Sequence, residues 1–470
     1  MRSSRTHLYG WLCVLVIAVL CGRAAGQRTA DERRIYEEQL RVRLDQQQPI
    51  ARELGLDAGG WFSFAFFNYD DAAARKERTL RQYELRLWGS LTIEGVHHFY
   101  VRAVAGYDDW NSGDNPDGEG DEWRDPDIER AWYHYDFNRH VRNRTGHDPW
   151  AGFTIHVGRD YYQMGSGLVL ALPLDAVDIT GNLGDVSVRG LLGKTIPETA
   201  NIDESRPVSD HMERCFYGVQ VKYTGFDRHE PYVYYLWQKD RTDPTPEVPT
   251  QGFRYDSRYL GVGSSGSVLL PNLRYSTELA FESGRSYAEG IADTREKIHA
   301  MALDVLLEYL FDVPKHPKLR FEYLWGSGDG DRRLSSCSTV GGNLRGTRDE
   351  AFNAFGFRDT GLALAPRIAN LHIFQLGLSG FPLEQVELFR KMEVGTTVYF
   401  FTKDAASGAI SDTTAMEDSS WVGWEWDVHL DWRLTSDVSW TVRYGVFQPG
   451  AAFADNQWRH FLFTGMVYSF

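Results

Sequence analysis

Residues 424–434 read WEWDVHLDWRL, a stretch in which large apolar and charged side chains alternate without a break. Successive side chains of a β-strand point to opposite faces of the sheet, so this stretch predicts a strand with one apolar and one charged face. Residues 82–93 repeat the pattern, with Tyr83, Leu85 and Leu87 on one side and Glu84 and Arg86 on the other. Strict alternation with the apolar side facing lipid is typical of a membrane β-barrel.

The same period-two pattern extends over the chain from about residue 60 and predicts eighteen strands, with an uncertainty of two. Short connections such as 94–96 and 434–437 alternate with long ones such as 108–126, 193–213 and 327–367. The connections 138–151 and 381–391 are long for turns, which leaves sixteen to eighteen strands open. The fold class expected is therefore all-β, a closed antiparallel transmembrane barrel over residues 60–470.

The last residues agree with a barrel that lies in an outer membrane. Leu462, Met466, Tyr468 and Phe470 occupy alternate positions of the final segment. A lipid-facing stripe that ends in an aromatic residue is the feature that the barrel-assembly machinery binds, so we expect that partner besides outer-membrane lipid.

The N-terminal residues have the order of a secretory signal peptide. Arg2 and Arg5 precede the apolar run 11–21, and the small residues 24–26 follow it. We expect residues 1–26 to be a cleaved signal and residues 27–59 to be a periplasmic segment that is either helical or unstructured. Together with the terminal stripe, this predicts export through the secretory pathway to the outer membrane of a Gram-negative-type bacterium.

Charge and cysteine content narrow the function classes. Removing residues 1–26 takes away three arginines and no acid, so the net charge changes from −15 to about −18. An exported chain this acidic is not suited to binding nucleic acid. Cys215 and Cys337 would remain, and the sequence leaves open whether they pair.

Four groups of residues resemble the alginate export family of outer-membrane barrels. They are Gly158-Arg159-Asp160 with the Gly-rich 164–168, 174–177 and Gly181; the strand end 325–329; Ala365-Pro366 with Asn370-Leu371; and Gly423 and Glu425 continuing through Leu434-Thr435 to 447–450. The resemblance spans residues 61–470. It implies a barrel of about eighteen strands that conducts an anionic polysaccharide out of the periplasm.

The charges expected in the lumen do not favour one sign, although a polyanion channel should present mainly cations. The residues expected at the lumen or its constriction are Arg159, Arg86, Arg102, Arg130, Arg274, Arg320, Arg443, Glu84, Glu425 and Asp427. We further expect residues 160–173 to fold into the lumen, with Arg159 either near the constriction or at the rim in a salt bridge. A general diffusion porin for small polar solutes or sugars is therefore the second interpretation.

An enzymatic function is the third interpretation. Residues 108–127 form an acidic stretch in which Asp114, Asp117, Glu119 and Asp121 are weak candidates for a Ca²⁺ site. No nucleophile elbow, HExxH, P-loop or CxxC motif occurs in the sequence. The sequence thus predicts a passive channel without a cofactor, and an outer-membrane barrel enzyme stays as an alternative.

Overall fold

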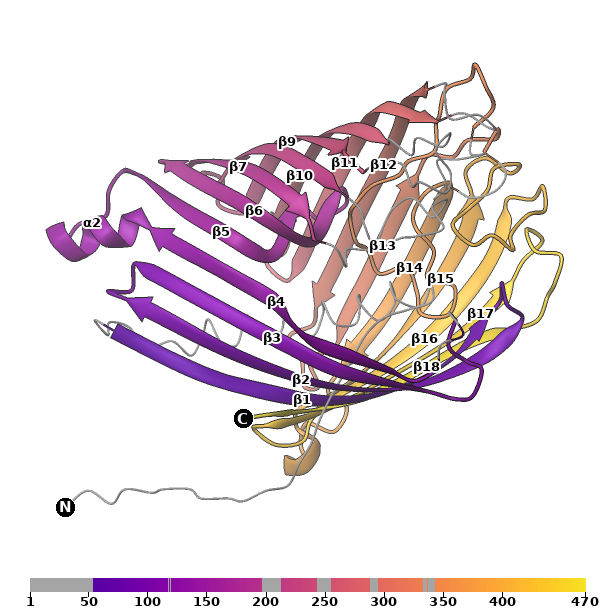
Figure 1. The fold of residues 1–470 in the computed structure, drawn as a ribbon, viewed down its shortest axis with the longest axis horizontal. Helices are drawn as coiled ribbons and strands as arrows, with labels where there is room; N and C mark the ends of the chain where they lie inside the picture. The colour runs from indigo at the N-terminus through magenta and orange to yellow at the C-terminus, as the bar shows by residue number, and fades with distance from the viewer. Residues whose placement is uncertain are drawn as a thin grey trace.

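The computed structural model describes residues 54–116, 118, 120–196, 213–242, 255–287, 295–332, 336 and 343–470. The expected signal peptide and most of the expected periplasmic segment lie outside these residues. The structure is one closed antiparallel barrel of eighteen strands, as predicted (Figure 1). The strands are β1 Leu54–Asp71, β2 Lys76–Ile93, β3 His97–Trp110, β4 Glu122–Asp136, β5 Ala151–Met164, β6 Leu170–Leu183, β7 Val186–Thr195, β8 Arg214–Tyr223, β9 His229–Asp240, β10 Asp256–Ser267, β11 Leu273–Tyr287, β12 Arg295–Leu310, β13 Lys318–Gly326, β14 Leu371–Gly380, β15 Met392–Lys403, β16 Trp421–Arg433, β17 Val438–Pro449 and β18 Arg459–Ser469.

Each strand pairs with its sequence neighbours, and β1 pairs with β18 to close the ring. Trp61 to Tyr69 lie opposite Ser469 to Phe461. Gly60 and the terminal Phe470 exchange two backbone hydrogen bonds of 2.9 and 3.0 Å. The last residue therefore forms part of the closure, and the first strand starts six residues before the boundary expected from the sequence.

The two ends of the barrel differ in their connections. One end, called here the turn end, carries the connections at 94–96, 184–185 and 434–437, and the other, the loop end, carries 327–370 and 404–420. The two long turns that made the strand count uncertain contain short helices, α2 Phe137–Thr145 and η1 Glu387–Phe389. Asp136 caps the start of α2 by accepting from the Arg139 N–H, and Gly146 ends it in the left-handed conformation. Among the described residues, no helix has the length and apolar character that crossing a bilayer demands.

Rows of outward aromatic rings mark the membrane belt on the wall from β1 to β5. The row nearer the loop end has one aromatic residue on each of β1 to β4, and each lies directly opposite the next across the ladder: Phe64, Tyr83, Tyr107 and Trp123. Phe99, Tyr133 and Phe153 lie nearer the turn end, with rings in contact through His97 and Tyr135. Between Trp123 and Tyr133, β4 has the length of about 9–11 residues that a transmembrane strand needs.

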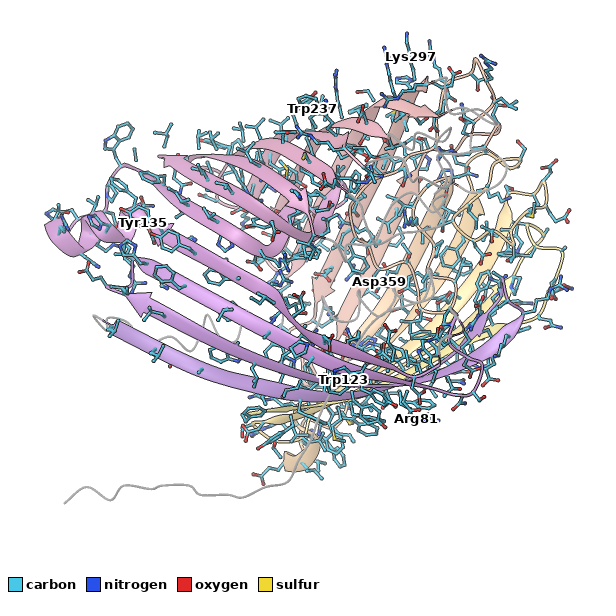
Figure 2. All side chains as sticks on the ribbon, in the orientation of Figure 1. Arg81, Trp123, Tyr135, Trp237, Lys297 and Asp359 are labelled. Atoms are coloured by element: carbon cyan, nitrogen blue, oxygen red, sulfur yellow. The ribbon has the colours of Figure 1, made fainter. Side chains whose placement is uncertain are left out.

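The outward face is apolar, and much of the inward face near the loop end is apolar as well. Leu85, Leu87, Val101, Trp426 and Met466 are exposed on the outside, as predicted from alternation. Figure 2 places Asp359 within the barrel and Trp237 on its outer surface. Inward aromatic residues such as Phe67, Phe401 and Phe461 are buried, because loops fold in and cover them. A simple rule of polar residues inside does not hold at this end.

We predict that Leu87→Arg lowers the yield of folded barrel. Leu87 is 49% exposed on the outside of β2, midway between the aromatic rows. Arginine at mid-bilayer costs about 2–4 kcal/mol. The inward Ser90→Arg, on the same strand, is the matched control and should fold normally. Heat-modifiable migration after refolding into vesicles measures the yield, and equal yields for the two variants would contradict the assignment of faces.

Candidate functional site

A network of guanidinium and carboxylate groups lies on the inner wall formed by β2, β3 and β4. The Glu129 carboxylate accepts from Arg86 at 2.8 and 2.9 Å and from Arg102 Nε at 2.7 Å. Glu84 is paired with Arg86 and lies 3.4 Å from Arg124. All these groups point to the lumen side of the ladder, since Glu84, Arg86 and Arg102 are buried while the intervening Leu85 and Leu87 are exposed.

Trp61 of β1 lies beneath this network. The guanidinium carbons of Arg86 and Arg102 are 5.7 and 5.3 Å from the centre of its ring. The ring face attracts both cations and holds their planes in place. Of the residues expected at the lumen, the structure thus brings Arg86, Arg102 and Glu84 together, and it adds Glu129, Arg124 and Trp61.

The sequence analysis missed Glu129 and Arg124, and the register of β3 and β4 explains why. The β3–β4 register shifts between Arg102 and Ala103 and again between Val104 and Gly106. Each bulge changes the face on which the following residues of β4 point. Period-two counting along β4 therefore fails at Glu129, and Arg124 lies in a stretch that was expected to be a loop.

The opposite wall carries mainly carboxylates. In the closed ring of eighteen strands, β12 lies across the barrel from β3. Arg274 and Arg320 are the inward guanidinium groups on β11 to β13. They are outnumbered by the inward carboxylates Glu278, Glu282, Asp304, Glu308 and Glu322. On β2 to β4 the two signs are about equal in number, with Arg78, Arg86, Arg102, Arg124 and Arg130 beside Glu84, Asp108, Glu122, Glu129 and Asp136.

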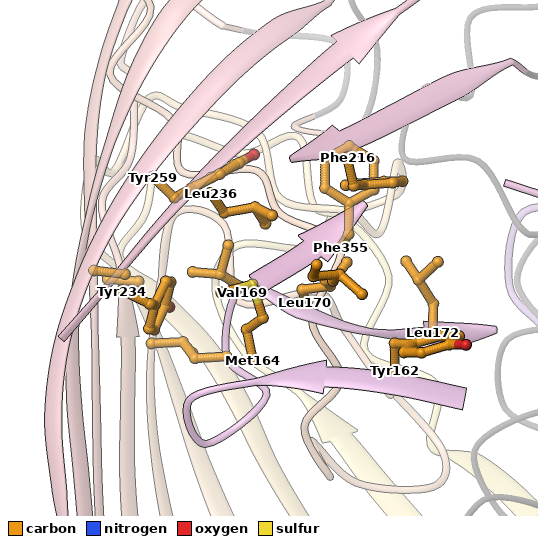
Figure 3. Packing of buried hydrophobic residues seen from close by; sticks show 14 of the residues in the cluster. Tyr162, Met164, Val169, Leu170, Leu172, Phe216, Tyr234, Leu236, Tyr259 and Phe355 are labelled. Atoms are coloured by element: carbon orange, nitrogen blue, oxygen red, sulfur yellow. The ribbon is translucent and has the colours of Figure 1, made fainter. Parts of the chain in front are cut away.

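The hairpin between β5 and β6 folds into the lumen, in agreement with the expectation for residues 160–173. Its tip is held by Glu278 of β11, which accepts from the Ser166 N–H at 2.5 Å, and by Gln220 of β8, which accepts from the Gly165 N–H at 2.9 Å. A Cβ atom on Gly165 would lie 2.3 Å from the Glu278 carboxylate, so only glycine permits this approach. Figure 3 shows Met164, Val169 and Leu170 packed against Tyr234 and Leu236 of the wall.

Residues 343–370 of the connection between β13 and β14 also enter the lumen, and inward carboxylates hold this loop there. Glu425 of β16 accepts three backbone N–H groups, from Leu362 at 2.5 Å, Ala363 at 2.7 Å and Leu364 at 2.8 Å. Arg358 of the loop is 2.7 Å from Asp304. Glu425 was expected to line the channel, but in the structure its carboxylate binds the loop.

The loop 404–420 is held in the same way by a cation of the wall. Asp412 contacts Arg459 of β18 at 2.5 Å and accepts from Thr414 at 2.6 Å. Burial disfavours the ionised carboxyl, but Arg459 and the hydrogen bonds from Thr414 outweigh it and lower the pKa of Asp412 below its ordinary value. Ile410 of this loop is fully buried against wall residues such as Phe401 and Phe447.

Arg159 does not face the lumen, so that expectation is wrong. It shares the outward face of β5 with Phe153 and Val157, whereas Asp160 points inward to Arg130 at 2.7 Å. Its guanidinium pairs with Asp175 of β6 at 2.9 Å. Arg159 lies beside the hairpin as expected, and its outward face is the one that alternation counted from Phe153 gives.

The remaining expected residues lie apart from the network. Arg443 contacts Asp431 at 3.0 Å, and Asp427 lies beside the inserted loop. Arg320 is bound to Glu322 at 2.6 Å. Arg274 lines a pocket of about 490 Å³ at the turn end, together with Arg228 and Glu308.

The acidic stretch 108–127 does not bring its candidate Ca²⁺ ligands together. Asp114 accepts from the Thr79 N–H and pairs with Lys76, and Asp121 accepts from the Trp110 N–H. Asp117 and Glu119 lie outside the described residues, as does Cys337. Cys215 is described as a thiol on β8. Within the described part of the chain, no three His, Cys, Asp or Glu side chains gather as metal ligands would.

Solved structures with this fold are outer-membrane proteins. OccAB1 of Acinetobacter baumannii superposes with a TM-score of 0.54 at 11% identity, over 88% of this chain and 96% of that one. OpdK of Pseudomonas aeruginosa gives 0.53 at 8% identity, over 88% and 99%. OccK2 (OpdF) of Pseudomonas aeruginosa, solved in complex with glucuronate, gives 0.53 at 11% identity, over 88% and 97%. Identities this low establish the common barrel alone.

The sequence itself identifies the family. No curated protein matches the chain. The family model for alginate export matches residues 200–464, which is more than half of the chain. The resemblance seen in the motifs at 325–329, 365–371 and 423–450 falls within this range. The protein is an outer-membrane β-barrel channel that belongs to the alginate export family.

Proposed function

We propose that the channel passes small polar solutes, including sugar acids, by passive diffusion, with the turn end facing the periplasm. The observation that carries this proposal is the separation of charge across the lumen. The paired guanidinium and carboxylate groups of β2 to β4 face a wall on β11 to β13 in which carboxylates outnumber guanidinium groups, and loop residues such as Arg358 engage part of these carboxylates. Such a lumen has a field across it and orients polar molecules without excluding either sign of ion.

Export of an anionic polysaccharide is the second candidate, and family membership favours it. A polyuronate presents one carboxylate per sugar, so it requires a continuous cationic path. Here Arg86 and Arg102 share Glu129, and Arg320 is bound to Glu322. These pairings leave little cationic surplus for a polymer, although a single sugar carboxylate can still exchange with Glu129.

Planar bilayers distinguish the two candidates. A tenfold KCl gradient should give a reversal potential near zero for the small-solute channel, and D-glucuronate should carry measurable current when it replaces chloride. A strong preference for chloride, together with block of the current by oligomannuronate at micromolar concentration, would overturn the small-solute proposal and favour polymer export.

The guanidinium wall gives a prediction for ion selectivity. Replacement of Arg102 by Gln removes one cation from the network, and the reversal potential should move toward K⁺ preference. The shift should shrink at high salt, because the screening length falls from about 10 Å at 0.1 M to about 3 Å at 1 M. Arg142→Gln removes the same charge from α2, outside the lumen, and is the control. An unchanged reversal potential in R102Q would show that this wall does not meet the permeating ions.

The inserted loop gives a prediction for conductance. Glu425→Ala removes three hydrogen bonds to the loop, each worth about 1.5–3 kcal/mol because the acceptor is charged. The loop should leave the wall, so single-channel conductance should rise and become noisier. Glu393→Ala removes an inward carboxylate of β15 that binds Ser379 and not the loop. Equal conductance in the two variants would mean that the loop does not limit the path.

A further inference from the structure

Among the described residues, β4 and β5 pair over the shortest stretch of any two neighbouring strands, and their separation beyond it is called here the seam. These strands pair only from Asp136 and Thr154 to Ala131 and Arg159. Beyond that point β5 turns inward with β6 as the lumen hairpin, and β4 continues along β3 (Figure 1). Within the described part of the chain, no strand pairs with the other edge of residues 122–128. Gly158 lies where the two strands separate and has a φ of 133°. A Cβ atom there would lie 2.2 Å from the Ala131 carbonyl oxygen.

The seam lies within the membrane belt. Trp123 belongs to the aromatic row near the loop end, and Tyr133 belongs to the row near the turn end. Ile128 pairs with Ala103, which pairs with Leu87 at mid-belt. The open edge thus occupies the half of the belt nearer the loop end. Hydrocarbon offers no hydrogen bonds to backbone groups, so this edge must meet something polar.

The sequence of the open edge, residues 122–128, disfavours pairing with a further strand. Pro126 has no N–H to offer a neighbouring strand, and Asp125 and Asp127 place charges beside it. The two register shifts against β3 twist the same stretch. These are the features by which sheet edges avoid pairing, so we conclude that the seam is a permanent part of the wall.

Charged groups lie on the inner and the outer face of the wall at the end of the seam nearer the turn end of the barrel. Inside, Arg130 bridges β4 to Asp160 of β5 at 2.7 Å. Outside, Arg159 donates to the Ile128 carbonyl oxygen at 2.9 Å and lies 3.7 Å from Asp127. Arg159 also pairs with Asp175 of β6, which lies in register with Lys194 of β7, so outward charges occur on three adjacent strands at this point of the wall. The seam therefore needs a hydrated or hydrogen-bonding surrounding at this height.

The bilayer side of the seam is apolar. Trp123 and Ile128 are 62% and 48% exposed, next to the polar edge. A ligand in this place meets hydrogen-bonding groups toward the wall and apolar side chains toward the membrane. We propose that the seam is a lateral portal between lumen and membrane, and that it binds an amphiphile with a hydrogen-bonding head and one acyl chain. The head lies at Arg159 and the edge of β4, and the chain lies along Ile128 and Trp123. This inference does not depend on the proposed function.

Spin labels test whether the seam is polar. Cysteine is introduced at Ile128 or at Leu87, which lies two strands away in the same cross-strand row, with Cys215 and Cys337 replaced by Ser. In liposomes, the label at 128 should collide several-fold more often with the water-soluble nickel complex NiEDDA than the label at 87. Both labels should be reached by oxygen. Equal, lipid-like accessibility at the two positions would overturn the portal.

Photocrosslinking tests whether an amphiphile binds. Tyr161 lies beside Arg130, with 5.9 Å from its ring centre to the guanidinium carbon, at the point where β5 turns inward. Tyr161 or the inward Phe463 of β18 is replaced by p-benzoylphenylalanine, and the barrel is reconstituted with radiolabelled lysophosphatidylcholine. Capture at 161 but not at 463 is expected. Capture at neither position, or equally at both, would overturn the proposed ligand even if the spin labels report water. Arg159→Leu in the 161 variant should lower capture severalfold.

Discussion

The hydrogen-bonding requirement of a backbone in hydrocarbon governs this molecule. Every strand must find two neighbours, so the sheet closes and Phe470 bonds back to Gly60. Closure of the barrel separates the lipid outside from the polar lumen inside. The outer face meets lipid and becomes apolar, and the inner face can hold ionised groups such as Glu84 and Arg86 that the outer face cannot. The positions of the charged side chains are consequences of this single constraint.

Closure also leaves an interior that must be filled. The β5–β6 hairpin, residues 343–370 and the loop 404–420 enter at the loop end, and the inner aromatic residues pack on them. A buried loop needs partners for its own N–H groups, and Glu425 and Glu282 supply them, the latter by accepting from Asn353 at 2.9 Å. Several inward carboxylates thus serve the loops and not the solute. An inventory of lumen charge taken from strands alone overstates what a permeating molecule meets.

The closed barrel and its inserted loops explain which features could be predicted from the sequence and which could not. Alternation in stretches such as 424–434 was sufficient for the class of fold, the strand count and the faces of Leu87 and Arg86. It could not assign Glu129, because a bulge changes the face without leaving a sign in the hydrophobic pattern. Arg159 follows the alternation of Phe153 and Val157, and its expected place in the lumen came from its charge and not from the pattern. Alternation could not distinguish Glu425 from Arg86 in role, since both occupy inward positions and only the fold of a distant loop separates them. The helices in the two long turns were likewise not visible in the strand count.

The pairing of Arg86 and Arg102 with Glu129 bears on what a channel of this kind can carry. Free guanidinium groups would bind a carboxylate tightly, and tight binding slows passage. A solute carboxylate that must compete with Glu129 gains only the difference between two similar hydrogen-bonded pairs, so it binds weakly and leaves again. The stacked Trp61 keeps both cations in position during the exchange, because the ring attraction does not depend on which carboxylate is bound. This exchange is what the proposed passage of single acidic sugars requires of a wall whose arginines are paired with its own acids. A polyanion would have to displace an acidic partner at each cation that it meets, since Arg130, Arg320 and Arg443 are paired with carboxylates as well.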